Sequence, residues 1–106
     1  MGYHYAQWLE STIFQRRLLS LAVDGDKIMQ CVFVQIRCRP GTTYAVAEEI
    51  TRREVHSELY STSGDFDLMA KIYVEKDVDI GRFVNENIAN IADVKRTRTT
   101  LTFKAF

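Results

Sequence analysis

The sequence has little proline, little cysteine and no excess charge of either sign. One proline and two cysteines occur in 106 residues, and 14 basic residues balance 14 acidic ones, for a formal net charge of zero. A chain with no net charge lacks the excess of basic residues expected of a nucleic-acid-binding domain. The only dense basic run, from Lys95 to Arg98, falls in a predicted strand and is interpreted as a solvated face. We therefore expect no direct contact with nucleic acid.

Long apolar runs are also missing. No stretch approaches the roughly 20 apolar residues of a membrane helix, and the N-terminus lacks a charged segment followed by an uninterrupted apolar core. We expect a soluble, cytoplasmic protein with no membrane partner. Cys31 and Cys38 have opposite parity in one predicted strand and stand roughly 23 Å apart at about 3.3 Å per residue, so they can neither bridge each other nor share a metal.

Motifs for catalysis, metals and cofactors are scarce. No phosphate-binding loop, dinucleotide fingerprint or zinc spacing occurs, and the pairs Asp24/Asp26 and Asp77/Asp79 lack the other ligands of an EF-hand. The two histidines lie in different predicted elements with no sign that they meet. We expect a non-enzymatic protein with no catalytic residues, no metal and no cofactor.

The chain has the size of one domain. Alternation of apolar residues predicts strands, and the i, i+3, i+4 spacing predicts helices. The predicted order is strand, helix, strand, strand, helix, strand, preceded by one extra amphipathic helix. These elements are the extra helix from Tyr3 to Val23, a strand from Gln30 to Arg39, a helix of about ten residues from Thr43 with Thr42 as its cap, a hairpin within Tyr60–Val74, a helix from Asp77 or Asp79 to Ile91, and a strand from Val94 to Phe106.

The hairpin is the most informative stretch. Ser63, Gly64 and Asp65 are residue types that form tight turns, Gly64 through positive φ and the other two by bonding nearby backbone amides. Beyond the turn, Leu68, Ala70, Ile72 and Val74 alternate with polar or aromatic residues, as in a strand with one aliphatic face.

The two halves of this order share one pattern, which predicts an α+β, ferredoxin-like βαββαβ fold with two helices on one face of a four-stranded sheet. We predict an N-terminal helix and linker over residues 1–28 and the fold itself over residues 29–106. The extra helix must cover its apolar stripe against the domain, a neighbouring subunit or another partner.

The second face of the predicted sheet is also apolar. Phe33, Met69, Tyr73 and Tyr60 fall there, and leaving them in water costs several kcal/mol at about 25 cal/mol per Å². Pairing two identical sheets covers this face, which predicts a face-to-face homodimer. The alternative is a monomer in which the N-terminal helix covers the same face.

From about Gln30 onward, the chain resembles the effector-binding domain of the Lrp/AsnC family, also called the RAM domain. The resemblance rests on Pro40-Gly41 before a helix, on the run from Val55 through the Ser63-Gly64-Asp65-Phe66-Asp67 turn, and on Val94 to Leu101. It implies a dimeric α/β barrel, commonly a ring of dimers, that binds a small-molecule effector, usually an amino acid, between dimers.

The resemblance also implies a site. It places the effector at Ser63, Gly64, Asp65, Phe66 and Asp67, with Thr97 and Thr99 as further candidates. A carboxylate can pair with an α-ammonium group, and turn amides and hydroxyls can bind an α-carboxylate. The alternative is that Asp65 and Asp67 only cap their own turn.

Full-length members of that family carry an N-terminal winged helix-turn-helix, and the residues before Met29 are too few for one. The sequence therefore indicates a stand-alone amino-acid-sensing module that could join full-length Lrp/AsnC regulators. Two alternatives stay open, namely a structural oligomer without effector and a small cofactor-free monooxygenase, since this fold hosts several functions. The monooxygenase would need a polar pocket in the barrel formed by Gln35, Lys71 and Tyr73.

Overall fold

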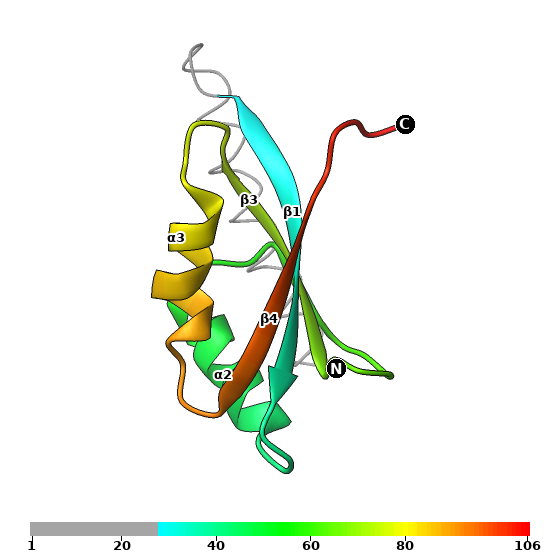
Figure 1. The fold of residues 1–106 in the computed structure, drawn as a ribbon, viewed down its shortest axis with the longest axis vertical. Helices are drawn as coiled ribbons and strands as arrows, with labels where there is room; N and C mark the ends of the chain where they lie inside the picture. The colour runs from blue at the N-terminus through cyan, green and yellow to red at the C-terminus, as the bar shows by residue number, and fades with distance from the viewer. Residues whose placement is uncertain (1–27) are drawn as a thin grey trace, which may run out of the picture.

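The computed structural model describes residues 28–106, which form a four-stranded antiparallel sheet with its helices on one side (Figure 1). The strand order is β2-β3-β1-β4, with β1 and β3 in the centre. This confirms the predicted ferredoxin-like α+β fold. The predicted helix from Tyr3 to Val23 lies outside the described residues. The strands are β1 (Met29–Cys38), β2 (Glu58–Ser61), β3 (Leu68–Glu75) and β4 (Val94–Leu101).

The core lies between the sheet and its helices. Strand β1 places alternate residues opposite those of β3, for example Val34 opposite Ala70 and Ile36 opposite Leu68, and these side chains are buried. The cluster is completed by four helical residues, Val46, Ile50, Val84 and Ile88, and by Ile91 in the connection to β4. The predicted aliphatic faces of both strands are thus confirmed, because one parity of each strand is removed from water.

Helix α2 (Thr43–Arg53) follows the Pro40-Gly41 turn, where Gly41 has a φ of +83°. Thr42 occupies the cap position, but its hydroxyl donates to the Arg39 carbonyl at 2.6 Å and makes no cap hydrogen bond. Thr42 is thus the N-cap residue, as predicted, but it caps with its backbone carbonyl, which accepts the Val46 N–H at 3.0 Å, and not with its side chain. The hydroxyl closes the preceding turn instead, and this turn also carries the Thr42 N–H to Arg39 carbonyl bond at 3.1 Å.

The second helix is shorter and less regular than the sequence predicts. Helix α3 (Ile80–Val84) begins at Asp79, whose carboxylate accepts the Arg82 N–H at 3.1 Å, as one of the two predicted caps requires. The chain then widens into a π-helix, η1 (Asn85–Ala89). A side chain from α2 supports this widened turn.

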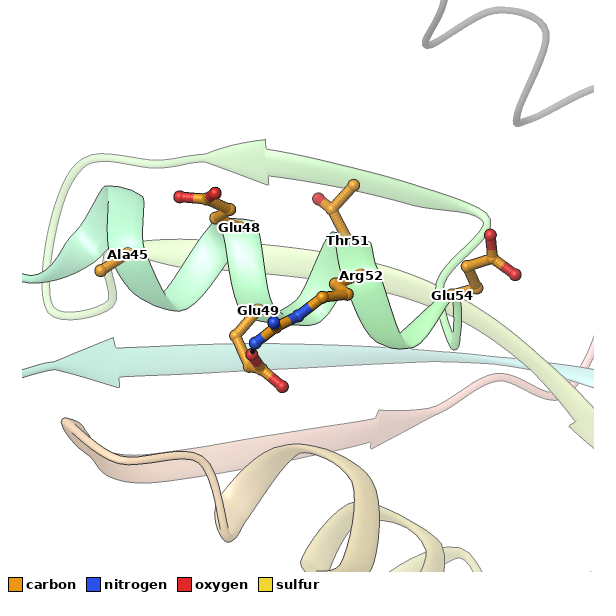
Figure 2. A pocket seen from close by; sticks show the side chains of 6 residues that line it. All are labelled: Ala45, Glu48, Glu49, Thr51, Arg52 and Glu54. Carbon is orange, nitrogen blue, oxygen red and sulfur yellow. Dashed lines mark hydrogen bonds and ion pairs between the residues drawn. The ribbon is translucent and has the colours of Figure 1, made fainter.

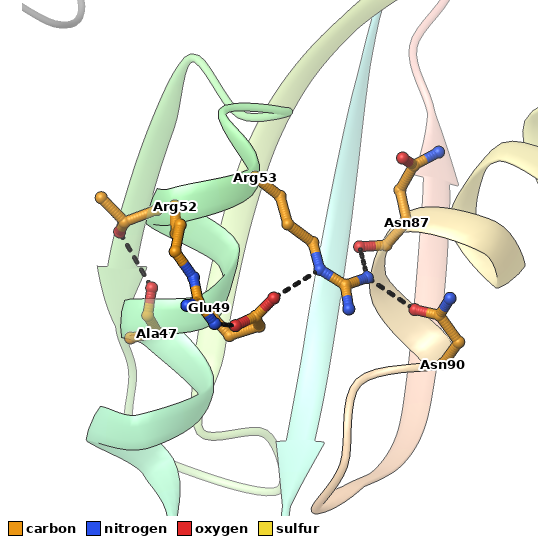
Figure 3. A network of polar contacts seen from close by, with 7 residues as sticks. Ala47, Glu49, Arg52, Arg53, Asn87 and Asn90 are labelled. Carbon is orange, nitrogen blue, oxygen red and sulfur yellow. Dashed lines mark hydrogen bonds and ion pairs between the residues drawn. The ribbon is translucent and has the colours of Figure 1, made fainter.

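That side chain is Arg53, which joins the two helices (Figure 3). Its guanidinium Nε donates to Glu49 at 2.8 Å, while Nη1 donates to the Asn87 carbonyl at 3.0 Å and to Asn90 Oδ1 at 2.7 Å. Glu49 and Arg53 therefore do not simply face water, although helical spacing places both off the buried stripe of α2. Both are half-buried, because the pair spans the gap between the helices.

The opposite face of the sheet carries the predicted aromatic and polar residues. Tyr60 lies opposite Met69, and Phe33 lies opposite Lys71, which places all four side chains on the side away from the helices. Tyr60 is 55% exposed. We call this the open face.

Strand β4 ends at Leu101, so the prediction of a strand up to Phe106 is wrong. Leu101 pairs with Val32 in the last pair of the β1–β4 ladder. The carbonyl of Cys31, the next residue of β1, accepts the Thr102 hydroxyl at 2.5 Å. Phe103 and Phe106 beyond it are fully exposed, and the tail turns away from the sheet on the side opposite the helices (Figure 1). Within residues 28–106, no helix is long and apolar enough to cross a membrane.

Candidate functional site

Three connections meet at one end of the sheet: the β1–α2 turn, the β2–β3 turn and the entry into β4 (Figure 1). The predicted site residues of the β2–β3 turn therefore lie beside the end of β1. Gly64 has a φ of +93°, which a residue with a Cβ adopts only under strain. The base of the turn is closed by the Thr62 N–H donating to the Asp67 carbonyl at 2.9 Å and the Thr62 hydroxyl donating to the Phe66 carbonyl at 3.0 Å.

Asp67 joins the turn to β1. Its carboxylate Oδ2 accepts the Cys38 backbone N–H at 2.7 Å, and its own N–H donates to the Ile36 carbonyl at 2.9 Å. The register between β1 and β4 shifts between Arg37 and Cys38. The Asp67 carboxylate therefore accepts a backbone N–H at the point where the strand ladder is irregular. Asp67 thus does not cap its own turn. It holds the turn against the neighbouring strand.

Ser63, Gly64 and Asp65 form the exposed tip. Within residues 28–106, neither the Ser63 hydroxyl nor the Asp65 carboxylate makes a hydrogen bond or ion pair, so the predicted side-chain bonds to turn amides are absent there. The Asp65 backbone carbonyl is engaged, because it accepts Arg37 Nη1 at 2.9 Å. The tip therefore presents a carboxylate and a hydroxyl to solvent.

Phe66 is buried, 7% exposed, yet does not belong to the main core cluster. Its ring lies under the guanidinium of Arg96, with 4.9 Å between Cζ and the ring centroid. Sequence reasoning missed both Arg37 and Arg96 as neighbours of the turn. The sequence contains one signal for them, the basic residues within Lys95–Arg98. Which of these residues faces the turn depends on the register shift between Arg37 and Cys38, which the sequence does not reveal.

The structure does not bring Thr97 and Thr99 to the turn within one copy. Thr97 pairs with Ile36 and Thr99 with Val34, which gives them the parity of the helix-covered face. Ile36 pairs with Leu68 on its other side, so β1 separates Thr97 from the start of β3 by two strand spacings, about 10 Å.

Cys38 is buried at this end, and its surroundings disfavour the thiolate form that a nucleophile needs. Burial raises the pKa of its thiol, and the nearby carboxylates of Asp67 and Asp93 raise it further, while a hydrogen bond with Thr43 lowers it. A raised pKa keeps the sulfur protonated and unreactive near neutral pH.

A hollow elsewhere on the molecule does not coincide with these residues. It runs along the outer side of α2 and has a polar lining (Figure 2) made of Ala45, Glu48, Glu49, Thr51, Arg52 and Glu54. Within residues 28–106, no group of three or more histidine, cysteine, aspartate or glutamate side chains is placed to hold a metal ion.

Comparison with known proteins identifies the domain. The family model of the Lrp/AsnC ligand binding domain matches residues 31–106. The chain belongs to this family. The Lrp/AsnC domain here is 29% identical over 72 residues to the HTH-type transcriptional regulator FL11 of Pyrococcus abyssi, a match that covers 68% of this chain and 47% of FL11. The chain thus spans about half the length of that curated relative.

Solved structures carry the same Lrp/AsnC fold. TTHA0845 from Thermus thermophilus is 35% identical with a TM-score of 0.65, over 73% of this chain and 96% of that one. E. coli AsnC is 14% identical with a TM-score of 0.65, over 71% and 51% respectively. A feast or famine regulatory protein from M. tuberculosis, solved in complex with L-methionine, is 22% identical with a TM-score of 0.57, over 90% and 73%.

Proposed function

We propose that this chain is a non-catalytic regulatory module that binds an amino acid at the Ser63–Asp67 turn and assembles as a homodimer. The observation that carries the proposal is the turn itself, an exposed polar tip fixed to β1 by the Asp67 carboxylate within a ligand-binding domain. The structural relative from M. tuberculosis in complex with L-methionine supports an amino acid as the ligand class.

The chemistry of the turn suits an α-amino acid. One oxygen of Asp67 is held by Cys38, which leaves the carboxylate group oriented for a ligand ammonium on its other oxygen. The Ser63 hydroxyl and the exposed amides around Gly64 are donors for an α-carboxylate, and successive amides in a turn form an anion-binding concavity. Phe66 supplies the buried base of the turn.

A second copy completes the site in this proposal. Thr97 and Thr99 lie across β1 from the turn and have the parity of the helix-covered face, unlike Arg96, so they reach a ligand at Ser63–Asp67 only when β4 of another subunit is brought to it. This requirement agrees with a ring in which dimers meet at the effector.

The open face supports the dimer itself. Phe33, Met69 and Tyr73 are half-buried there and Tyr60 is more exposed, while both helices lie on the other side of the sheet. Two such faces placed together remove their aromatic surface from water. The same assembly would allow mixed oligomers with full-length Lrp/AsnC regulators, of which FL11 is a relative of about twice the matched length.

The open face does not favour a monooxygenase. The Lys71 Nζ lies 3.2 Å from Glu58 Oε2 and 5.3 Å from the centroid of the Tyr73 ring. Both neighbours raise the pKa of Lys71, and Tyr73 has the larger effect. A raised pKa keeps the ammonium protonated, so Lys71 cannot take a proton as a general base.

Isothermal titration of the purified chain with each of the twenty amino acids tests the proposal. We expect saturable binding of at least one amino acid and its loss in Asp67→Asn, which removes the charge but keeps a side-chain oxygen for the Cys38 N–H. Asp77→Asn is the matched control, because Asp77 is an exposed carboxylate beyond the other end of β3. Silence across the panel, with an intact oligomer, would instead favour a scaffold without effector.

A further inference from the structure

We infer that Arg37 and Arg96 form a carboxylate-binding pair beside the turn, which makes the effector an acidic amino acid. The inference rests on the proposed function, because it names the ligand class for the same site. The turn would hold the α-ammonium and α-carboxylate groups, and the two guanidinium groups would hold the side-chain carboxylate.

The first observation is the register. Arg37 on β1 lies directly opposite Arg96 on β4. Directly opposed residues of antiparallel strands have Cα atoms about 4.5–5.5 Å apart and share a face of the sheet. Two like charges in this position destabilise the pair. The arrangement is therefore unfavourable for an isolated domain unless an anion compensates it.

The second observation is that each guanidinium is already oriented. Arg37 donates one N–H to the Asp65 carbonyl at 2.9 Å, which draws it toward the turn. Arg96 lies over the buried Phe66 ring at 4.9 Å. Within residues 28–106, the Arg96 guanidinium makes no hydrogen bond or ion pair beside this contact, so its N–H donors stay available for bidentate binding of a carboxylate.

The third observation is the charge balance at this end of the sheet. Within residues 28–106, neither Arg37 nor Arg96 has a carboxylate within ion-pair distance. The nearby carboxylates pair with neither arginine: Asp67 accepts the Cys38 N–H on one oxygen, Asp93 pairs with Arg39 at 3.4 Å, and Asp65 lies at the exposed tip. Two oriented cations thus border a site that already has donors for an amino-acid backbone.

Titration calorimetry with paired ligands tests this inference. Aspartate and glutamate are compared with asparagine and glutamine, which have the same shape without the side-chain charge, and succinate serves as an anion without an ammonium group. Arg37→Gln and Arg96→Gln each remove one cation. Arg98→Gln is the matched control, because Arg98 has the same parity of β4 but faces Gln35.

We expect the wild-type chain to prefer the acidic member of a pair by about tenfold or more, a preference that Arg96→Gln and Arg37→Gln abolish and Arg98→Gln keeps. Equal binding of acid and amide would overturn the inference and leave the proposed function standing. Succinate binding that depends on Arg37 and Arg96, without binding of any amino acid, would support the anion pair and reject the amino-acid proposal. The inference is also wrong if both arginine variants keep wild-type ligand binding but weaken the oligomer, or if neither amino acids nor succinate bind.

Discussion

The Asp67 carboxylate accepts the backbone N–H of Cys38 at 2.7 Å and so joins the β2–β3 turn to the irregular end of β1. We expect Asp67→Ala to lower the free energy of unfolding by about 1–3 kcal/mol, because a part-buried N–H loses its acceptor. Urea denaturation followed by circular dichroism measures this change.

Asp65→Ala is the control for that prediction. The Asp65 side chain is exposed and makes no hydrogen bond or ion pair within the described part of the chain, so its removal should alter the free energy of unfolding by less than about 0.5 kcal/mol. Equal losses in both variants would show that the Cys38 contact is not what stabilises the turn.

Phe66 and Arg96 should be energetically coupled. Phe66→Leu and Arg96→Gln each remove one partner of the ring–guanidinium contact, and we expect a double-mutant coupling of about 0.5–1 kcal/mol, as for a cation–π pair near the surface. Replacing Arg98 in the same cycle should give no coupling, since Arg98 faces Gln35. A coupling energy of zero for Phe66 and Arg96 would contradict an energetic role for this contact.

Arg53 should stabilise the π-helix η1 specifically. We expect Arg53→Gln to speed hydrogen exchange of amides in residues 85–90, because Asn87 and Asn90 lose the guanidinium that binds them from α2. Arg52→Gln is the matched variant, since Arg52 is an exposed neighbour whose ion pair among the described residues is to Glu49 of its own helix. Exchange mass spectrometry that finds the same protection in both variants would rule out this role.

The cysteines should make stability fall in alkaline solution. Burial raises the pKa of Cys38, and the Asp67 and Asp93 carboxylates add to the rise; burial also raises the pKa of Cys31. A raised folded-state pKa gives stability that is fully present below the unfolded thiol value of about 8.5 and is lost as pH rises toward the folded pKa.

Urea midpoints between pH 7 and about 9.5 check this prediction, below the range in which tyrosine and lysine ionise in the unfolded chain. Cys38→Ala should lose less stability across this range than the wild-type chain, although it starts lower because it leaves a small cavity. An identical pH dependence in both proteins would contradict the assignment to Cys38.

A charge on the open face should separate the proposed dimer. We expect Met69→Lys to sediment as a 12.3 kDa monomer and the wild-type chain at about twice that mass, because Met69 lies on the side of the sheet away from the helices. Tyr44→Lys places the same charge at a residue of α2 that is 85% exposed, and it should keep the dimer. A wild-type chain that sediments at 12.3 kDa would reject the dimer.

The sequence predicted the fold because its signals are local and periodic. The alternation from Leu68 to Val74 and the Gly64 turn depend only on near neighbours in the chain, and the structure confirms the strand. The π-helix and the end of β4 were not predictable in this way. The first is supported by Arg53, more than thirty residues away. The second falls where the tail leaves β1, since the Thr102 hydroxyl takes the Cys31 carbonyl although β1 itself continues to Met29.

The site was predictable only in part, for the same reason. The residue types from Ser63 to Asp67 predict a polar turn. The positions of Arg37 and Arg96 beside that turn depend instead on the register of three strands. A single bulge at Cys38 decides which side chains of β4 face the turn. No periodic pattern encodes that shift.

Within residues 28–106, strand β4 lies at an edge of the sheet, and its backbone groups on the outer side are a template on which another chain can add. Its residues Thr99, Thr100 and Leu101 are strand-forming and exposed, so this part of the edge favours pairing with another strand. Lys95, Arg96 and Arg98 act as gatekeepers, because stacking such edges would bring their charges together. The basic residues beside the turn therefore oppose edge-to-edge aggregation. A variant that neutralises several of them at once is expected to be less soluble, so its ligand binding would be harder to measure.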